Sequence, residues 1–177
     1  MLQITHILTN FAANKIYNDI IKRSITMNIG DTIPEILGTD RAGNAVRATD
    51  FAGRRLIIYF YPKDNTPGCT AEACSLRDGY DSLRELGYEV IGISKDSVSS
   101  HIKFAEKYEL PFTLLSDSTT EVNQAFDVWK LKKMCGKEYM GTMRTTFVTD
   151  ADHRITHIIN KVDTKDAAGQ LLKLLKE

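Results

Sequence analysis

Two closely spaced cysteines lie in a stretch whose residue types suit thiol chemistry. Residues 62–74 read PKDNTPGCTAEAC, with Cys69 directly after a proline and a glycine and Cys74 five positions later. The sequence predicts a helix that begins at Cys69, because helix formers follow it as far as Gly87, a natural C-cap. The first N–H groups of a helix lack partners and carry partial positive charge, so a thiolate in that turn is stabilised. Since the thiolate is the nucleophilic form, we expect Cys69 to be reactive.

The five-residue spacing prevents a disulfide while this helix is intact. Residues five apart in a helix have Cα atoms separated by about 8–9 Å and side chains that point about 140° apart. A disulfide needs Cα atoms within roughly 7 Å of each other. We therefore expect Cys69 to react in the folded state and Cys74 to bond with it only after local unwinding. The alternative is that both are small buried apolar residues, the commonest fate of free cysteine.

Composition narrows the classes of function. A chain of 177 residues with a formal net charge of zero predicts one globular domain and argues against a nucleic-acid binder built on a basic surface. No apolar run approaches the roughly 18 residues of a membrane span, and no secretory signal is visible, so we expect no membrane and a cytoplasmic setting. In that reducing compartment, closely spaced cysteines are more often catalytic or metal-binding than structural.

The elements that would position these thiols form an α/β pattern from Met27 onward. Residues 1–26 have apolar side chains at roughly helical spacing, and we interpret them as an extension, helical or flexible, before a domain at 27–177. The sequence predicts strands at 54–61, 88–94 and 112–116, a hairpin at 145–150 and 154–162, and helices at 69–87, 96–110, 120–128 and 165–176. This order predicts a mixed central sheet with helices on both faces.

Residues 60–80, FYPKDNTPGCTAEACSLRDGY, strongly resemble the active-site segment of peroxiredoxins of the bacterioferritin comigratory protein type, also called peroxiredoxin Q. The family pattern is proline, three residues, threonine or serine, two residues and cysteine. The resemblance runs from about Met27 to the C-terminus and includes GDTIPEI, VIGISKDSVSSHIKFAEKY, LPFTLLSD and GTMRTTFVTD. It implies a thioredoxin-like fold.

The resemblance also implies a role for each matching residue. Cys69 matches the peroxidatic cysteine, which attacks a peroxide oxygen and becomes a sulfenic acid. Thr66 matches the hydroxyl that orients the peroxide, Pro62 the residue that shields the site, and Arg144 the arginine that holds thiolate and peroxide. Cys74 matches the resolving cysteine of part of the subgroup, which condenses with the sulfenic acid to a disulfide.

A thioredoxin-dependent peroxidase is therefore the activity that the resemblance implies. Its substrates would be hydrogen peroxide and organic hydroperoxides, and a thioredoxin-like dithiol would recharge it by thiol–disulfide exchange. The family implies a monomer that needs no cofactor and no metal.

Other functions remain open on the residues alone. A thioredoxin-like disulfide reductase would use C-x-x-C, which is absent. A redox-controlled binding protein or peroxide sensor could use the same cysteine pair, with helix unwinding exposing a surface to a partner. A zinc-binding module is the weakest alternative, because His153 and His157 have no acidic or thiol partners nearby, and we expect these histidines and His101 at the surface.

A third cysteine, Cys135, lies in KLKKMCGKEYMG, where relatives of this subgroup carry an aromatic residue. We assign it a structural or incidental role, because Cys74 fits the family position. Four lysines surround it, and we interpret them as a solvated face that could also steer anions or a partner. They are Lys130, Lys132, Lys133 and Lys137.

Overall fold

The computed structural model describes residues 26–134 and 136–176 of the chain. Nearly all of the predicted extension, and Cys135, lie outside the described residues, so the boundary at 26 and the role of that cysteine stay predictions. In the part of the chain that is described, no helix is long and apolar enough to cross a membrane.

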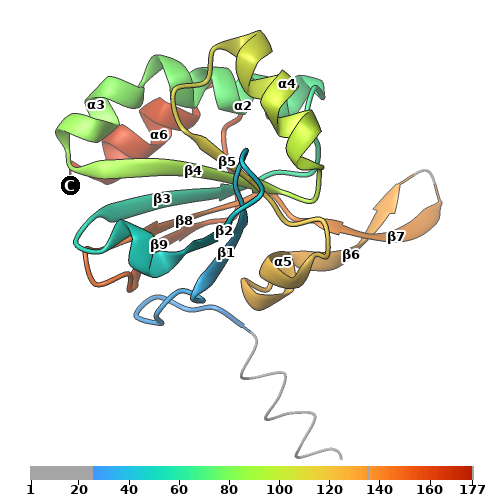
Figure 1. The fold of residues 1–177 in the computed structure, drawn as a ribbon, viewed down its shortest axis with the longest axis horizontal. Coiled ribbons are helices and arrows are strands. Elements are labelled where there is room, and N and C mark those ends of the chain that lie inside the picture. The colour runs from blue at the N-terminus through green and yellow to red at the C-terminus, as the bar shows by residue number, and fades with distance from the viewer. Residues whose placement is uncertain (1–25, 135, 177) are drawn as a thin grey trace, which may run out of the picture.

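A seven-stranded mixed sheet forms the centre of the molecule, with strand order β2-β1-β5-β4-β3-β8-β9 (Figure 1). Strands β3, β4 and β5 are parallel, whereas β8 pairs antiparallel with β3 and β9 with β8. At the other edge, β1 runs antiparallel to β5 and to β2. The strands are β1 (Ile36–Thr39), β2 (Ala45–Arg47), β3 (Arg55–Phe60), β4 (Tyr88–Ser94), β5 (Thr113–Ser116), β8 (Thr145–Thr149) and β9 (Ile155–Ile159).

Helices cover both faces of this sheet, which confirms the predicted architecture (Figure 1). One face carries α2 (Pro67–Asp78), α3 (Tyr80–Glu85), α4 (Val98–Tyr108) and α6 (Ala167–Leu174). The opposite face carries the 3-10 helix η1 (Ala48–Phe51) and α5 (Glu121–Ala125). The sheet therefore separates two apolar clusters, and α2, which holds both cysteines of interest, packs on the more helical side.

Strand β3 supplies both clusters, because successive side chains of a strand point to opposite faces. Ile57 and Tyr59 belong to the cluster under α2, whereas Leu56, Ile58 and Phe60 belong to the cluster under α5. All five are fully buried. This two-sided burial explains why the sequence shows a continuous apolar run here instead of an alternating one.

The single helix predicted for residues 69–87 is wrong. Helix α2 begins two residues earlier, at Pro67, and ends at Asp78; a separate short helix, α3, follows Gly79. A Cβ atom at Gly79 would lie 2.4 Å from the Cβ of Ala168, so glycine lets α6 pack directly against the break. The contact that requires a glycine at this break comes from α6, far along the chain, so local sequence patterns do not show it.

The sequence predictions miss four strands: β1 and β2 at the edge of the main sheet, and a separate pair. Strands β6 (Trp129–Met134) and β7 (Lys137–Thr142) pair antiparallel in a separate two-stranded sheet. They project from the main body, and we call residues 129–143 the arm (Figure 1). Most of its residues are exposed, so the arm lacks the buried apolar run by which the other strands are recognised.

The close approach at Gly79 predicts a stability effect. Gly79→Ala should destabilise the protein by about 1–3 kcal/mol, because the added methyl group overlaps Ala168. Urea unfolding at constant m-value measures this loss. The double variant Gly79→Ala with Ala168→Gly should recover part of it, because the second change removes the overlapping methyl. A single variant as stable as the wild type would contradict the predicted overlap.

Candidate active site

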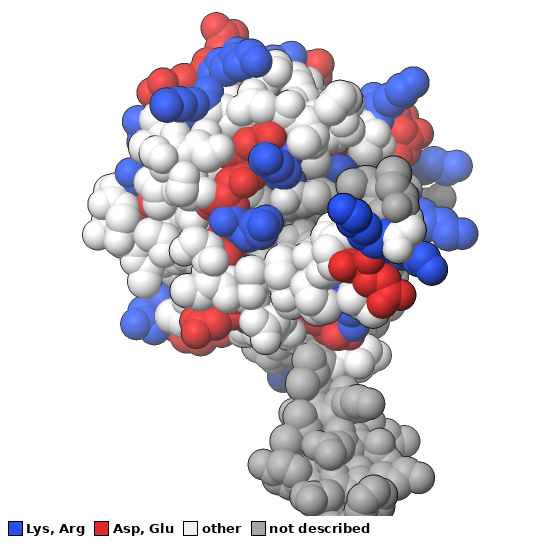
Figure 2. Space-filling model, turned by 90° about the vertical axis from the view of Figure 1, so that its right-hand side faces the viewer, with Lys and Arg blue, Asp and Glu red and all other residues white. Residues whose placement is uncertain are grey.

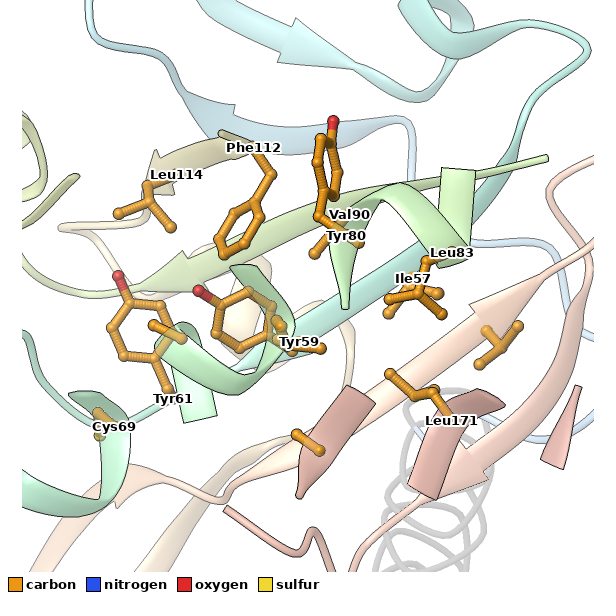
Figure 3. Close-up of a cluster of buried hydrophobic side chains, with 14 of the residues drawn as sticks. Ile57, Tyr59, Tyr61, Cys69, Tyr80, Leu83, Val90, Phe112, Leu114 and Leu171 are labelled. Atoms are coloured by element: carbon orange, nitrogen blue, oxygen red, sulfur yellow. The ribbon is translucent and has the colours of Figure 1, made fainter. Parts of the chain in front are cut away.

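Cys69 lies where a buried strand turns into a helix. Strand β3 ends at Phe60, residues 61–66 form a loop, and α2 begins at Pro67 with Thr66 as its N-cap. Cys69 is the third residue of the helix and is 1% exposed. It lies at one end of the apolar cluster under α2 (Figure 3). The prediction that this cysteine occupies the first turn of a helix, where orphan N–H groups favour an anion, is confirmed.

Arg144 reaches Cys69 from the neighbouring strand. It stands directly before β8, whose first residue, Thr145, pairs with Phe60 at the end of β3. This register brings the arginine beside the loop, and its Nη2 donates a hydrogen bond of 3.2 Å to the Cys69 Sγ. The sequence separation of 75 residues is thus closed by antiparallel strand pairing.

Glu72 is a site residue that sequence reasoning missed. It lies three residues after Cys69 in α2, is fully buried, and forms an ion pair with Nη1 of Arg144. Burial raises the pKa of its carboxyl to about 7, although the arginine charge works in the opposite direction. The signal that could have found it is the C-x-x-E spacing, which places both side chains on one face of a helix.

The guanidinium of Arg144 is therefore held between two acidic groups. Burial works against its charge, but the negative charges of Glu72 and Cys69 raise the pKa of Arg144. One nitrogen faces the thiol and another faces the carboxylate, so the planar fork has a fixed orientation. A Cβ atom at Gly68 would lie 3.6 Å from Nη2, so the guanidinium approaches the start of the helix closely at this residue.

The other predicted site residues, Thr66, Pro62 and Cys74, lie before and after Cys69 in the sequence. Thr66 is half-buried, and its hydroxyl donates to the backbone carbonyl of Lys63 at 3.0 Å. Pro62 is half-buried at the start of the loop. Cys74 is half-buried near the middle of α2, and it and Cys69 are free thiols. The intact helix keeps these cysteines apart, as their spacing predicts.

A buried polar cluster anchors the loop that leads to Cys69. The carboxylate of Asp64 accepts hydrogen bonds from the Tyr61 hydroxyl at 2.8 Å and the Ser100 hydroxyl at 2.6 Å, and His101 Nδ1 lies 2.9 Å away. Its backbone N–H donates to Asp96 at 2.6 Å. Burial opposes ionisation, but the hydrogen bonds from His101 and Ser100 lower the pKa of Asp64. The loop is therefore fixed to α4 just before the thiol.

The surface location predicted for two of the histidines is wrong. His101 is 4% exposed and belongs to the Asp64 cluster. His153 is also buried, and its Nε2 lies 3.1 Å from the backbone carbonyl of Phe51. Histidine spacing alone gives no measure of burial, because the partners come from distant parts of the chain. Among the described residues, no group of histidine, cysteine and acidic side chains could hold a metal ion.

A mixed sheet of this topology, with a buried cysteine at a helix N-terminus facing an arginine, defines a thioredoxin-like protein. Comparison with known proteins identifies the class further. The sequence model of the AhpC/TSA family matches residues 29–158. The chain is 46% identical to peroxiredoxin Bcp of Bacillus subtilis over 153 residues, which cover 86% of this chain and 98% of that protein.

Solved structures agree with this match. A bacterioferritin comigratory protein of Xanthomonas campestris, studied for its alkyl peroxide reduction activity, superposes with a TM-score of 0.74 at 33% identity. The superposition covers 82% of this chain and 98% of that one. The PrxQ of Xylella fastidiosa gives a TM-score of 0.76 at 34% identity, covering 85% and 96%.

The chain belongs to the AhpC/TSA family and, within it, to the peroxiredoxins of the Bcp and PrxQ type. It is a thiol-dependent peroxidase, and the family implies peroxide substrates and a thioredoxin-type reductant. These relatives do not favour the alternative of a redox-controlled binding protein or peroxide sensor.

The Asp64 cluster predicts a pH-dependent contribution to stability. Asp64→Asn should lower the free energy of unfolding by about 1–3 kcal/mol at neutral pH, because an amide presents a donor to groups that need an acceptor. The folded-state pKa lies below the ordinary value of 3.8, so the stabilising effect is present above that pH and is lost as pH falls through the folded pKa.

Urea titrations of wild type and variant between pH 3 and pH 7 test this expectation. The difference between the two proteins should be constant at neutral pH and should narrow below about pH 4. A difference that stays constant down to pH 3 would contradict the role of the ionised carboxylate.

Proposed function

We propose that the Cys69 thiolate reduces hydroperoxides at the start of α2. The observation that carries this proposal is the 3.2 Å hydrogen bond from Arg144 to the Cys69 Sγ, next to the positive end of the helix. The sulfur attacks one peroxide oxygen, the O–O bond breaks, and Cys69 becomes a sulfenic acid. The departing oxygen takes up a proton and leaves as water or an alcohol, so the sulfur loses the two electrons that the peroxide gains.

Arg144 would act on both reactants in this step. Its guanidinium stabilises the thiolate before the attack and the negative charge that develops on the leaving oxygen during it. The buried carboxylate of Glu72 is the positioning residue, because its ion pair fixes the guanidinium plane in a dry environment. The geometry is therefore set before peroxide arrives, and no reorganisation is needed during the reaction.

Thr66 and Pro62 complete the peroxide site in this proposal. The Thr66 hydroxyl lies at the N-cap, one helical turn before the thiol, where it can accept the hydroperoxide proton while donating to Lys63. Pro62 covers the loop side and limits access of water to the thiolate. Gly68 faces Nη2 without a side chain, so a peroxide could approach the guanidinium from this side.

Cys74 would resolve the sulfenic acid. Its thiol condenses with the Cys69 sulfenic acid to give a disulfide and water. Because both residues belong to α2, at least the first turns of that helix must unwind. The half-exposed position of Cys74 supports this step, since little packing is lost when its side chain moves. A dithiol protein of thioredoxin type then reduces the disulfide.

We further propose that the substrates include organic hydroperoxides, in line with the alkyl peroxide reduction studied in the Xanthomonas relative. Both redox cysteines belong to one chain, so the cycle can run in a monomer. A cytoplasmic location fits the need for a continuous supply of reduced dithiol. The formal net charge of zero supports a protein that binds neither nucleic acid nor membrane.

Serine variants of the two cysteines test the proposed cycle. Cys69→Ser should abolish peroxide consumption, whereas Cys74→Ser should keep the first oxidation and lose recycling by thioredoxin. Stopped-flow oxidation by hydrogen peroxide and steady-state turnover with thioredoxin measure the two steps separately. Undiminished turnover in Cys69→Ser would remove this cysteine from the mechanism. Normal thioredoxin recycling in Cys74→Ser would assign the resolving role to Cys135 or to an external thiol.

The carboxyl of Glu72 predicts an acid limb in the rate of Cys69 oxidation. Its pKa of about 7 means that the Arg144 ion pair weakens as pH falls through that value, so the rate should fall on the acid side. Glu72→Gln should slow oxidation about tenfold at pH 8, because the guanidinium loses its charged support, and the limb near pH 7 should vanish. A variant whose pH profile matches the wild type would rule out this role.

A further inference from the structure

The arm carries most of the exposed large apolar side chains of the described protein. Six such side chains are exposed in the described residues, and four of them lie on the arm. The four are Leu131, Tyr139, Met140 and Met143. Exposed apolar residues that gather on one projecting element, instead of being scattered singly, mark an interaction surface.

The strand register places two of these side chains together. Leu131 pairs with Met140 across the β6–β7 ladder, so both point to the same face of the arm, which Trp129 and Thr142 also share two positions away. Leu131 is 62% exposed and Met140 is 46% exposed. Neither contributes to the two buried clusters of the domain, so the fold does not explain their apolar character.

The arm is also strongly basic in a protein without net charge. Between residues 129 and 142 there are four lysines and one glutamate, which gives a local formal charge of +3 against zero for the whole chain. In Figure 2 the arm points toward the viewer, and several blue side chains gather around its end. A partner for this surface would therefore combine an apolar contact area with acidic residues around it.

The base of the arm is continuous with the thiol site. Met143 donates its backbone N–H to Val128 at 2.7 Å, which closes the base, and the next residue is Arg144. The Arg144 side chain contacts Cys69. Any protein that reduces an oxidised Cys69 must approach this corner of the molecule, and the arm projects beside that approach.

We propose that the arm is the docking surface for the dithiol protein that recycles the enzyme. Its partner has an apolar surface next to its reactive cysteine and acidic residues at the rim of that surface. The inference rests on the proposed Cys69–Cys74 cycle. On the docked partner, one thiolate attacks a sulfur of the disulfide, the S–S bond breaks, and a mixed disulfide forms. The partner's second thiolate then attacks the partner's own sulfur in the mixed disulfide and releases the enzyme's thiolate. A disulfide remains on the partner, so two electrons have passed from the partner to the enzyme.

Recycling by two reductants of different size tests the proposal. The variant Leu131→Ser with Met140→Ser should raise the KM for bacterial thioredoxin, supplied with its NADPH-dependent reductase, by about tenfold. Oxidation of Cys69 by hydrogen peroxide, followed without any reductant, should be unchanged. Turnover with dithiothreitol should also be unchanged, because a small dithiol needs no docking surface. Ile29→Ser, at a 67% exposed apolar residue outside the arm, is the matched control and should behave as wild type.

A charge variant gives an independent measurement that does not depend on apolar packing. Lys133→Glu with Lys137→Glu should lower kcat/KM for thioredoxin about tenfold at low salt, with a smaller loss at high salt because the charges are then screened. An unchanged KM for thioredoxin in both variants would overturn the proposal. An equal loss with dithiothreitol would also overturn it, since the arm would then serve the thiol site itself.

The oligomeric state shows whether the arm binds the dithiol partner or a second copy of this chain. Sedimentation of the wild type and of the Leu131→Ser, Met140→Ser variant should give the same mass. A dimer that dissociates in the variant would assign the arm to self-association and overturn the proposal. If Cys69 is oxidised at the normal rate in all arm variants, the proposed peroxidase function stands whether or not the docking proposal fails.

Discussion

The position of one guanidinium determines the geometry of the whole site. Arg144 lies between the Cys69 thiol and the buried Glu72 carboxylate, and each of its two terminal nitrogens has one of these partners. The fully buried Glu72 carboxylate would be strongly unfavourable without that cation, whereas Arg144 is only half-buried and keeps some contact with solvent. The fold resolves this by bringing β8 beside β3, so that the arginine enters from one strand and both acidic groups from the helix that follows the other.

The same helix has to satisfy two opposed requirements. An ordered first turn gives Cys69 its electrostatic environment, but the proposed disulfide with Cys74 requires that turn to open. Helix α2 has 12 residues and ends at Asp78, before the break at Gly79, so the unwinding is confined to a short segment. Its contact with α6, through the Ala168 N–H and the Ser75 hydroxyl at 3.2 Å, lies beyond Cys74. That contact can remain while the turns between the cysteines unwind.

The sequence predicts local features of this structure well and distant contacts poorly. The apolar run of β3 and the placement of Cys69 in the first turn of a helix follow from composition and from Pro67 and Gly68, so both could be predicted, although the helix starts at Pro67. The importance of Glu72 depends on an arginine that reaches it from another strand. The burial of His101 depends on its partner Asp64, which lies 37 residues away in the sequence. In each case the missing information is which elements pack together, and local periodicity does not contain it.

The anchors around α2 explain how unwinding could stay local in the proposed cycle. On the N-terminal side, hydrogen bonds from Ser100 and His101 to the buried carboxylate of Asp64 hold the loop against α4. Breaking them would leave a buried carboxylate without partners, which is energetically costly. On the other side of the thiol, the backbone of Arg144 adjoins β8, whose pairing with β3 does not involve the helix. Opening α2 therefore moves the cysteines but leaves the loop and the strand that carries the arginine in place. When a reductant restores the thiols, the helix refolds against the loop and strand β8, which have kept their positions. The thiolate site is then recovered without refolding of the rest of the domain.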